Sequence, residues 1–119
     1  MSRQKVLGAL AGLTALMAAQ GAFAHAKLLL SAPAKDAAGA SPAEIVLTFS
    51  EAVTPASVTL ADQDGHEVKS LGAARAEGAA LHVPVTAKLV PGRYTLTYRI
   101  AGADTHAVNG ALTFVVANP

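Results

Sequence analysis

Residues 89–100, "LVPGRYTLTYRI", give the clearest indication of the fold class of this chain. From Tyr94 onward its apolar and polar residues alternate, which is the pattern of a β-strand with one buried and one solvated face. An L-x-P-G-x-Y motif that ends at Tyr94 precedes the strand, and it is typical of the place where a Greek-key strand begins. In such a corner the tyrosine hydroxyl bonds back to upstream backbone. We therefore expect Tyr94 to have a structural role and no chemical one.

The same alternation continues on both sides of this stretch, with turn signals such as Asp64-Gly65 between the runs. Alternating runs at such short intervals are typical of half-buried antiparallel strands. Together they predict one all-β domain of about seven strands, built as a two-sheet Greek-key sandwich or a Greek-key barrel. The runs that carry the pattern lie at residues 26–31, 45–49, 58–60, 81–85, 94–100 and 112–116.

Two details refine this expectation. Pro84 interrupts one run, and because proline lacks the N–H that a sheet ladder requires, we expect an edge strand or a bulge there. Residues 34–44, "AKDAAGASPAE", are rich in alanine and glycine and show no alternation, so they predict a surface loop. The sequence contains no internal repeat and no linker that would separate a second domain.

The beginning of the chain has the pattern of an export signal. Arg3 and Lys5 form a positive start, a mostly apolar and uncharged run follows, and the small-x-small site "AFA" ends at Ala24. We expect cleavage after Ala24, which divides the chain into a signal peptide, 1–24, and a mature domain, 25–119. The alternative is an uncleaved N-terminal anchor, although the apolar run is shorter than the roughly 20 residues that span a bilayer.

The composition of the mature domain excludes several functions. Seven basic and eight acidic residues remain, so the formal net charge is −1 and no basic stripe is present to bind nucleic acid. The chain has no cysteine, and its two methionines, Met1 and Met17, leave with the signal peptide. The mature domain therefore has neither a disulfide nor a soft sulfur ligand for a metal.

His25 is the residue that cleavage after Ala24 would place first in the mature chain. Its free α-amine and its own imidazole Nδ1 would then close a six-membered chelate ring on one metal ion. An internal histidine cannot do this, because its backbone nitrogen is an amide. The alternative is that a histidine follows the cleavage site by chance.

A second candidate feature is the D-x-H motif of Asp104 and His106, ahead of the last strand. In extended backbone both side chains would point to the same face, with Cβ atoms about 6–7 Å apart, because a strand rises roughly 3.3 Å per residue. At that separation a carboxylate oxygen and an imidazole nitrogen converge on one ion. Alone the motif is weak, because a solvated loop that carries two polar residues is the commoner explanation.

The N-terminal histidine and the D-x-H motif support a metal site more strongly together than alone. The start of the first strand and the loop before the last strand can lie at one end of a sandwich. His25, Asp104 and His106 would supply an amine nitrogen, two imidazole nitrogens and a carboxylate oxygen. Nitrogen and oxygen donors without sulfur favour Cu(II), with Ni(II) and Zn(II) as weaker candidates. We expect one Cu(II) per chain.

Three other polar residues are weaker candidates. His66 follows Asp64-Gly65 in a turn, where polar residues are expected without further cause. His82 alternates with apolar neighbours and should face solvent, so we expect neither histidine to bind a metal. Glu51 stands at the end of a strand. It is either ordinarily solvated or a carboxylate that orients a ligand histidine without touching the metal.

These motifs resemble the CopC family of periplasmic copper-binding proteins in bacterial copper resistance and homeostasis. The resemblance covers the mature chain and rests on "HAKLLLSAPA", "IVLTFSEAV", "LADQDGHEV", the corner at 89–100 and "ADTHAVNGALTFVV". It implies a cupredoxin-like, immunoglobulin-like β-sandwich in which His25, Asp104 and His106 bind Cu(II), with Glu51 close by. Some members also carry a methionine-rich Cu(I) site. Because the mature chain has no methionine, it resembles the Cu(II)-only type.

The function we expect is therefore a soluble, monomeric periplasmic Cu(II) carrier and not an enzyme. The resemblance suggests that an inner-membrane transporter of the CopD type is its partner. Two alternatives stay open. One is a copper monooxygenase, because polysaccharide-cleaving enzymes also use an N-terminal histidine chelate, although they often present surface aromatics and all four mature aromatics here occupy core-like positions. The other is an adhesion-type sandwich without a metal.

Overall fold

The computed structural model describes residues 25–118, so the predicted signal peptide lies outside the described residues. The described part forms eight β-strands, and no helix in it is long and apolar enough to cross a bilayer. The strands are β1 (Leu28–Ala32), β2 (Ala38–Gly39), β3 (Glu44–Phe49), β4 (Thr54–Ala61), β5 (Arg75–Glu77), β6 (Ala80–Pro84), β7 (Gly92–Ala101) and β8 (Ala107–Val116).

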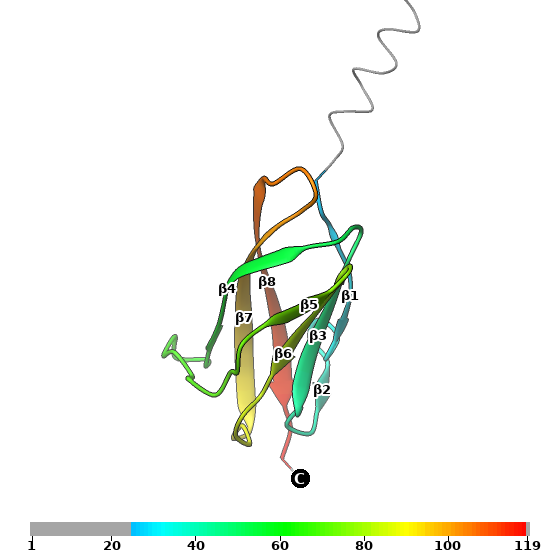
Figure 1. The fold of residues 1–119 in the computed structure, drawn as a ribbon. Helices are drawn as coiled ribbons and strands as arrows, with labels where there is room; N and C mark the ends of the chain where they lie inside the picture. The colour runs from blue at the N-terminus through cyan, green and yellow to red at the C-terminus, as the bar shows by residue number, and fades with distance from the viewer. Residues whose placement is uncertain (1–24, 119) are drawn as a thin grey trace, which may run out of the picture.

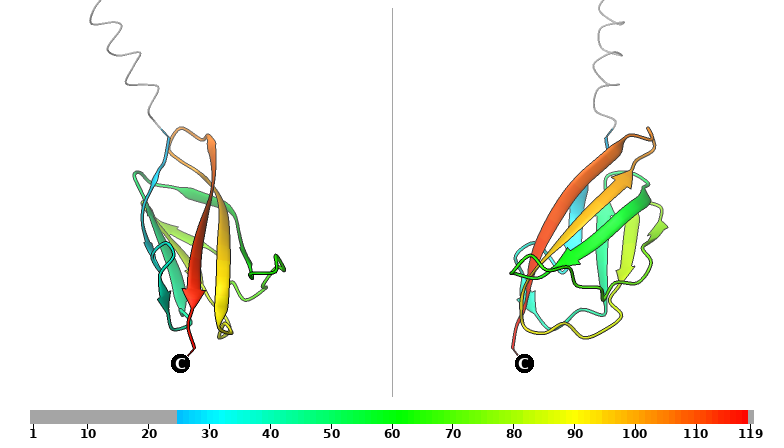
Figure 2. Two further views of the ribbon diagram at one scale, coloured as in Figure 1. Left: turned by 180° about the vertical axis from the view of Figure 1, so that it is seen from behind. Right: turned by 90° about the vertical axis from the view of Figure 1, so that its left-hand side faces the viewer.

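These strands form two four-stranded sheets that pack face to face (Figure 1). The strand order is β1-β3-β6-β5 in one sheet and β2-β8-β7-β4 in the other. Figure 2 shows the same two layers from behind and from the side. Each sheet ends in two edge strands, so the domain is a sandwich and not a closed barrel, and the predicted all-β class is confirmed.

The core lies between the two sheets and is built from alternate residues of the strands. In β3, Ile45, Leu47 and Phe49 are buried, whereas the residues between them are more exposed. Leu96 and Ile100 of β7 are fully buried on the opposite side of the core. This arrangement is the period-two burial that the alternation predicts, and it confirms the interpretation of these runs as half-buried strands.

The predicted tyrosine corner is present at the start of β7. The hydroxyl of Tyr94 donates a hydrogen bond of 2.6 Å to the backbone carbonyl of Val90. The Tyr94 ring is buried and stacks on Phe114, with 5.8 Å between the ring centroids. Tyr94 therefore fixes the chain at the entry to β7, which is the structural role expected from the sequence.

The hairpin of β7 and β8 is the longest element of the domain and carries the turn at 102–106. Its strands of ten residues each pair antiparallel from Gly92↔Val116 to Ala101↔Ala107. Within it, Tyr98 lies opposite Gly110, where any side chain at residue 110 would overlap the tyrosine ring. The closely packed hairpin therefore holds the turn at one end of the sandwich.

Two short strands differ from the sequence-based expectation of about seven strands. Residues 34–44 do not form a simple loop, because β2 lies within them and pairs parallel to β8 through Ala38↔Val115 and Gly39↔Val116. The strand β5 pairs with β6 through three residue pairs. Neither segment has a run of alternating apolar residues, so both depend on hydrogen bonds to a neighbouring strand that the local sequence does not show.

The expectation of an edge strand or a bulge at Pro84 is wrong. The strand β6 lies between β3 and β5, and it pairs with β3 without a shift in register. Pro84 is the last residue of β6, and the pairing with β5 has already ended at His82. On that side the Pro84 carbonyl accepts a hydrogen bond of 2.9 Å from the Gly72 amide. The proline is tolerated because the missing N–H falls where β5 no longer requires it.

Candidate metal centre

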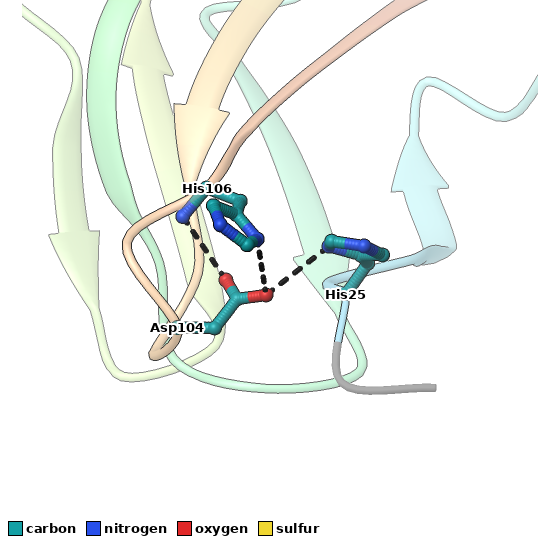
Figure 3. Close-up of side chains that lie close together, drawn as sticks. All are labelled: His25, Asp104 and His106. Atoms are coloured by element: carbon teal, nitrogen blue, oxygen red, sulfur yellow. Dashed lines mark hydrogen bonds and ion pairs between the residues drawn. The ribbon is translucent and has the colours of Figure 1, made fainter. Parts of the chain in front are cut away.

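His25, Asp104 and His106 lie close together at one end of the sandwich (Figure 3). His25 stands just before β1, whereas Asp104 and His106 belong to the turn between β7 and β8. Nδ1 of His25 lies 3.1 Å from Oδ2 of Asp104, and Nδ1 of His106 lies 3.3 Å from the same oxygen. One ligand atom from each residue lies within 4.8 Å of the other two, a spacing that suits a single ion.

The turn that carries Asp104 and His106 is not extended, so the strand geometry expected for the D-x-H motif is wrong. The Thr105 amide donates to the Gly102 carbonyl at 3.0 Å, and the His106 amide donates to Oδ1 of Asp104 at 3.1 Å. Because Ala101 pairs with Ala107, the chain must reverse direction between them. The two side chains therefore meet across a tight turn, not along one face of a strand.

His25 is held near this turn by the residues that follow it. Ala26 is buried in the core. The Lys27 amide donates to Oγ of Ser50 at 2.9 Å, and the Ser50 amide donates to the Lys27 carbonyl at 2.8 Å. These contacts tie the segment after His25 to the end of β3, which fixes the position of His25 relative to the turn.

The three side chains differ in their exposure to solvent. The side chain of Asp104 is 22% exposed and lies between the two imidazoles, whereas those of His25 and His106 are 57% and 71% exposed. An ion held by this group would therefore be reached directly from solvent. Such an open arrangement suits reversible binding better than permanent burial of an ion.

Glu51 lies beneath the turn. Its Oε1 is buried and has no hydrogen-bond partner among the described residues, so this oxygen is not ordinarily solvated. A Cβ atom added to Gly102 would lie 2.8 Å from this oxygen and 3.3 Å from Cβ of Ala26. The carboxylate therefore occupies the place where the turn and the residue after His25 meet, and only a residue without a side chain leaves room for it there.

His82 is more covered than expected for a solvent-facing residue. Its side chain is 19% exposed, with Nδ1 at 3.0 Å from Oε1 of Glu44 and Nε2 at 3.8 Å from Oε2 of Glu77. Glu44 and Glu77 belong to β3 and β5, the strands on either side of β6. His82 therefore lies between two carboxylates on the outer face of its sheet, which is not the sheet that carries the D-x-H turn.

A second group of potential ligands, not expected from the sequence, consists of Asp62, Asp64 and His66. Oδ1 of Asp62 accepts hydrogen bonds of 3.0 Å from the backbone amides of Asp64 and His66. The spacing D-x-D-x-H was visible in the sequence and could have marked this group. Here Asp62 organises its own turn, a common role for an aspartate in such loops.

The fold and the site together define a β-sandwich protein with an open candidate metal centre at one end of its sheets. The family model of the CopC domain matches residues 28–117. The chain therefore belongs to the CopC family. Asp104 and His106 lie inside the matched range, and His25 precedes it.

Individual relatives agree with this assignment. Copper resistance protein C of Xanthomonas campestris pv. juglandis is 36% identical over 111 residues, which cover 86% of this chain and 87% of the relative. Protein YobA of Escherichia coli K12 is 34% identical over 113 residues, which cover 91% of each chain.

Two solved structures are similar to the fold of this chain. The crystal structure of CopC from Methylosinus trichosporium OB3b matches with a TM-score of 0.69 and 27% identity, over 78% of this chain and 94% of that one. PcoC, a methionine-rich copper resistance protein from Escherichia coli, matches with a TM-score of 0.66 and 30% identity, over 78% and 99%. PcoC is described as methionine-rich, whereas this chain has no methionine after Met17.

Proposed function

We propose that this protein is an exported Cu(II)-binding protein of bacterial copper resistance or homeostasis, which holds one Cu(II) and passes it to a partner. The observation that carries the proposal is the meeting of His25, Asp104 and His106 within one ion's reach. Membership of the CopC family and the similarity to copper resistance protein C support copper as the cargo.

The proposed ligands are the α-amine and imidazole of His25, a carboxylate oxygen of Asp104 and an imidazole nitrogen of His106. The amine becomes available only after cleavage behind Ala24, so export and metal binding are linked in this proposal. Nδ1 of His25, the atom that would close the chelate ring with the amine, already faces Oδ2 of Asp104. All of these donors bind a metal in their deprotonated form.

The donor set favours Cu(II) over Cu(I). Three nitrogens and one carboxylate oxygen stabilise the doubly charged ion, whereas Cu(I) prefers thiolate and thioether ligands. The chain has no cysteine, and no methionine follows Met17. We therefore propose a carrier of Cu(II) alone, without transfer between two sites of different oxidation state.

A carrier fits the surface better than a polysaccharide monooxygenase does. Such an enzyme often presents aromatic residues to its polymer, but Phe49, Tyr94, Tyr98 and Phe114 are all buried in this domain. The anionic Asp104 would also oppose the reduction to Cu(I) that oxygen chemistry requires. The exposed imidazoles of His25 and His106 suit ligand exchange with a partner, for which we propose a membrane transporter of the CopD type in the periplasmic space.

The role proposed for Glu51 is indirect. Its buried oxygen lies beside Gly102 and Ala26, each of which is next to a segment that carries a proposed ligand. From that place the carboxylate influences how the turn and the N-terminal residue approach each other. We assign it no bond to the ion.

A Cu(II) titration of the protein secreted to the periplasm, with its N-terminus sequenced, tests the proposed function. We expect a first residue of His25, one tight Cu(II) equivalent and an electron paramagnetic resonance spectrum with nitrogen ligands. An oxygen-consumption assay with ascorbate and polysaccharide should show no turnover. Failure to bind Cu(II) would refute the proposal, and substrate-dependent oxygen consumption would favour the monooxygenase instead.

A further inference from the structure

Thr105 adopts a backbone conformation that is unusual for its residue type. Its φ is 66°, in the left-handed region. The other residues with positive φ in the described part are Asp36, Gly65, Gly78 and Gly92. Glycine and aspartate enter this region readily, but a β-branched residue does so at a steric cost. Such a conformation persists only where the surrounding structure holds it.

Two hydrogen bonds donated by backbone amides enclose this conformation. The Thr105 amide donates to the Gly102 carbonyl at 3.0 Å, and the amide of the next residue, His106, donates to Oδ1 of Asp104 at 3.1 Å. On both sides the chain is fixed by the pairing of Ala101 with Ala107. The Thr105 side chain is exposed, and its hydroxyl forms no hydrogen bond with any of residues 25–118. The backbone of Thr105, and not its side chain, therefore carries the geometry.

Because of this geometry, the two oxygens of Asp104 have different partners. Oδ1 is occupied by the His106 amide, which the left-handed residue turns back toward the aspartate. Oδ2 is left facing both imidazoles, at 3.1 Å from His25 and 3.3 Å from His106. With φ near −65° at residue 105, the His106 amide would no longer point toward Oδ1 of Asp104. Oδ2 of Asp104 and the imidazole of His106 would then not keep their present positions.

We infer that Thr105 is a positioning residue for the metal centre: its left-handed backbone conformation, and not its hydroxyl, presents Oδ2 of Asp104 and the imidazole of His106 to a Cu(II) ion. The inference rests on the proposed function for its ligand. It adds a residue whose own side chain does not bind the ion to the determinants of Cu(II) affinity.

Three substitutions separate the backbone from the hydroxyl. Thr105→Val keeps the shape and removes the hydroxyl, whereas Thr105→Asn favours the left-handed region. Thr105→Pro fixes φ near −65° and removes the amide that bonds Gly102. Each is compared with the wild type as processed protein, by competition titration of Cu(II), by electron paramagnetic resonance and by thermal unfolding.

We expect Thr105→Val and Thr105→Asn to keep the Cu(II) dissociation constant within about threefold and to leave the spectrum unchanged. Thr105→Pro should weaken Cu(II) binding by at least roughly 30-fold and alter the spectrum. Its unfolding midpoint should fall, because the native φ and the bond of the Thr105 amide are lost, but it should stay above the temperature of the titration. A tenfold loss in Thr105→Val would show that the hydroxyl contributes to Cu(II) binding and would overturn the inference. Tight binding with an unchanged spectrum in Thr105→Pro would overturn it as well.

A measurement without any variant guards against a proline chain that does not fold. Amide hydrogen exchange in the copper-free wild type should be at least about tenfold slower at Thr105 and His106 than at Ala103, because the first two amides are hydrogen-bonded. Equal exchange at the three sites would overturn the inference. If the wild type does not bind Cu(II), the proposed function fails, but amide exchange still reports on the turn. If the wild type and Thr105→Pro bind Cu(II) equally well, only the role of Thr105 fails.

Discussion

Oδ2 of Asp104 lies 3.1 Å from Nδ1 of His25, although one residue belongs to the turn before the last strand and the other precedes the first strand. The contact joins the two sheets of the sandwich at one end, because β1 and β8 belong to different sheets. The same oxygen lies 3.3 Å from Nδ1 of His106. Asp104 therefore links the two histidines of the candidate centre, since one of its oxygens contacts both.

Because the two oxygens of Asp104 have separate partners, Asp104→Asn and Asp104→Ala should differ. An asparagine keeps an oxygen that accepts from the His106 amide, but its nitrogen cannot bind the metal. We expect Cu(II) affinity to fall by at least roughly tenfold in Asp104→Asn and further in Asp104→Ala, which also loses the hydrogen bond. Competition titration measures the affinity, and exchange of the His106 amide reports the turn. Unchanged affinity in Asp104→Asn would exclude the carboxylate as a ligand.

His106→Ala should weaken Cu(II) binding and change the electron paramagnetic resonance spectrum, because it removes one of the three nitrogen donors. His82→Ala and His66→Ala are matched controls and should do neither. His82 is held between Glu44 and Glu77, and His66 belongs to the turn organised by Asp62. An effect of either control as large as that of His106→Ala would mean that the site is wrongly assigned.

Tyr94→Phe should destabilise the domain by about 1 kcal/mol, because it removes a neutral hydrogen bond to the Val90 carbonyl while the ring still packs. Tyr98→Phe is the control, since the Tyr98 hydroxyl forms no hydrogen bond with the rest of residues 25–118. Urea unfolding of both variants measures the difference. The role of the corner would be contradicted by a Tyr94→Phe protein as stable as the wild type.

Stability should fall as the pH rises above about 10. Burial raises the pKa of Tyr94 above its ordinary value of 10.0, with a further contribution from Asp62, and burial alone raises the pKa of Tyr98. Above pH 10 the unfolded chain therefore releases these protons while the folded chain still holds them, so the free energy of unfolding decreases. Urea unfolding between pH 9 and about 11 measures this decrease, and Tyr98→Phe should make it shallower. Constant stability over that range would show that neither tyrosine is linked to folding.

Much of the fold was predictable because most strands have one buried face. The alternation in β3 and β7 follows directly from the core positions of residues such as Leu47 and Leu96, and the Tyr94 corner follows from a local motif. The short strands β2 and β5 were not predictable in this way. Ala38–Gly39 and Arg75–Glu77 bury no alternating face, and they become strands only through hydrogen bonds to β8 and β6.

For the candidate site, the donor chemistry was visible in the sequence but the geometry was not. The choice of His25, Asp104 and His106 came from the types of ligand and from their places in the chain. The D-x-H spacing did not reveal that Thr105 turns left-handed, because nothing local marks a threonine for that conformation. The burial of Oε1 of Glu51 against Gly102 depends on the packing of two distant segments, which no single stretch of sequence contains.

The most direct test of the central claim compares two N-termini of the same domain. One protein begins at His25 with a free amine, and in the other the same amine is acetylated, which removes it as a donor and adds no new one. If the amine and imidazole of His25 chelate the ion, the acetylated protein should bind Cu(II) at least roughly tenfold more weakly and give a different electron paramagnetic resonance spectrum, with equal thermal stability in the copper-free state. Equal Cu(II) affinity and identical spectra for the two proteins would contradict the account.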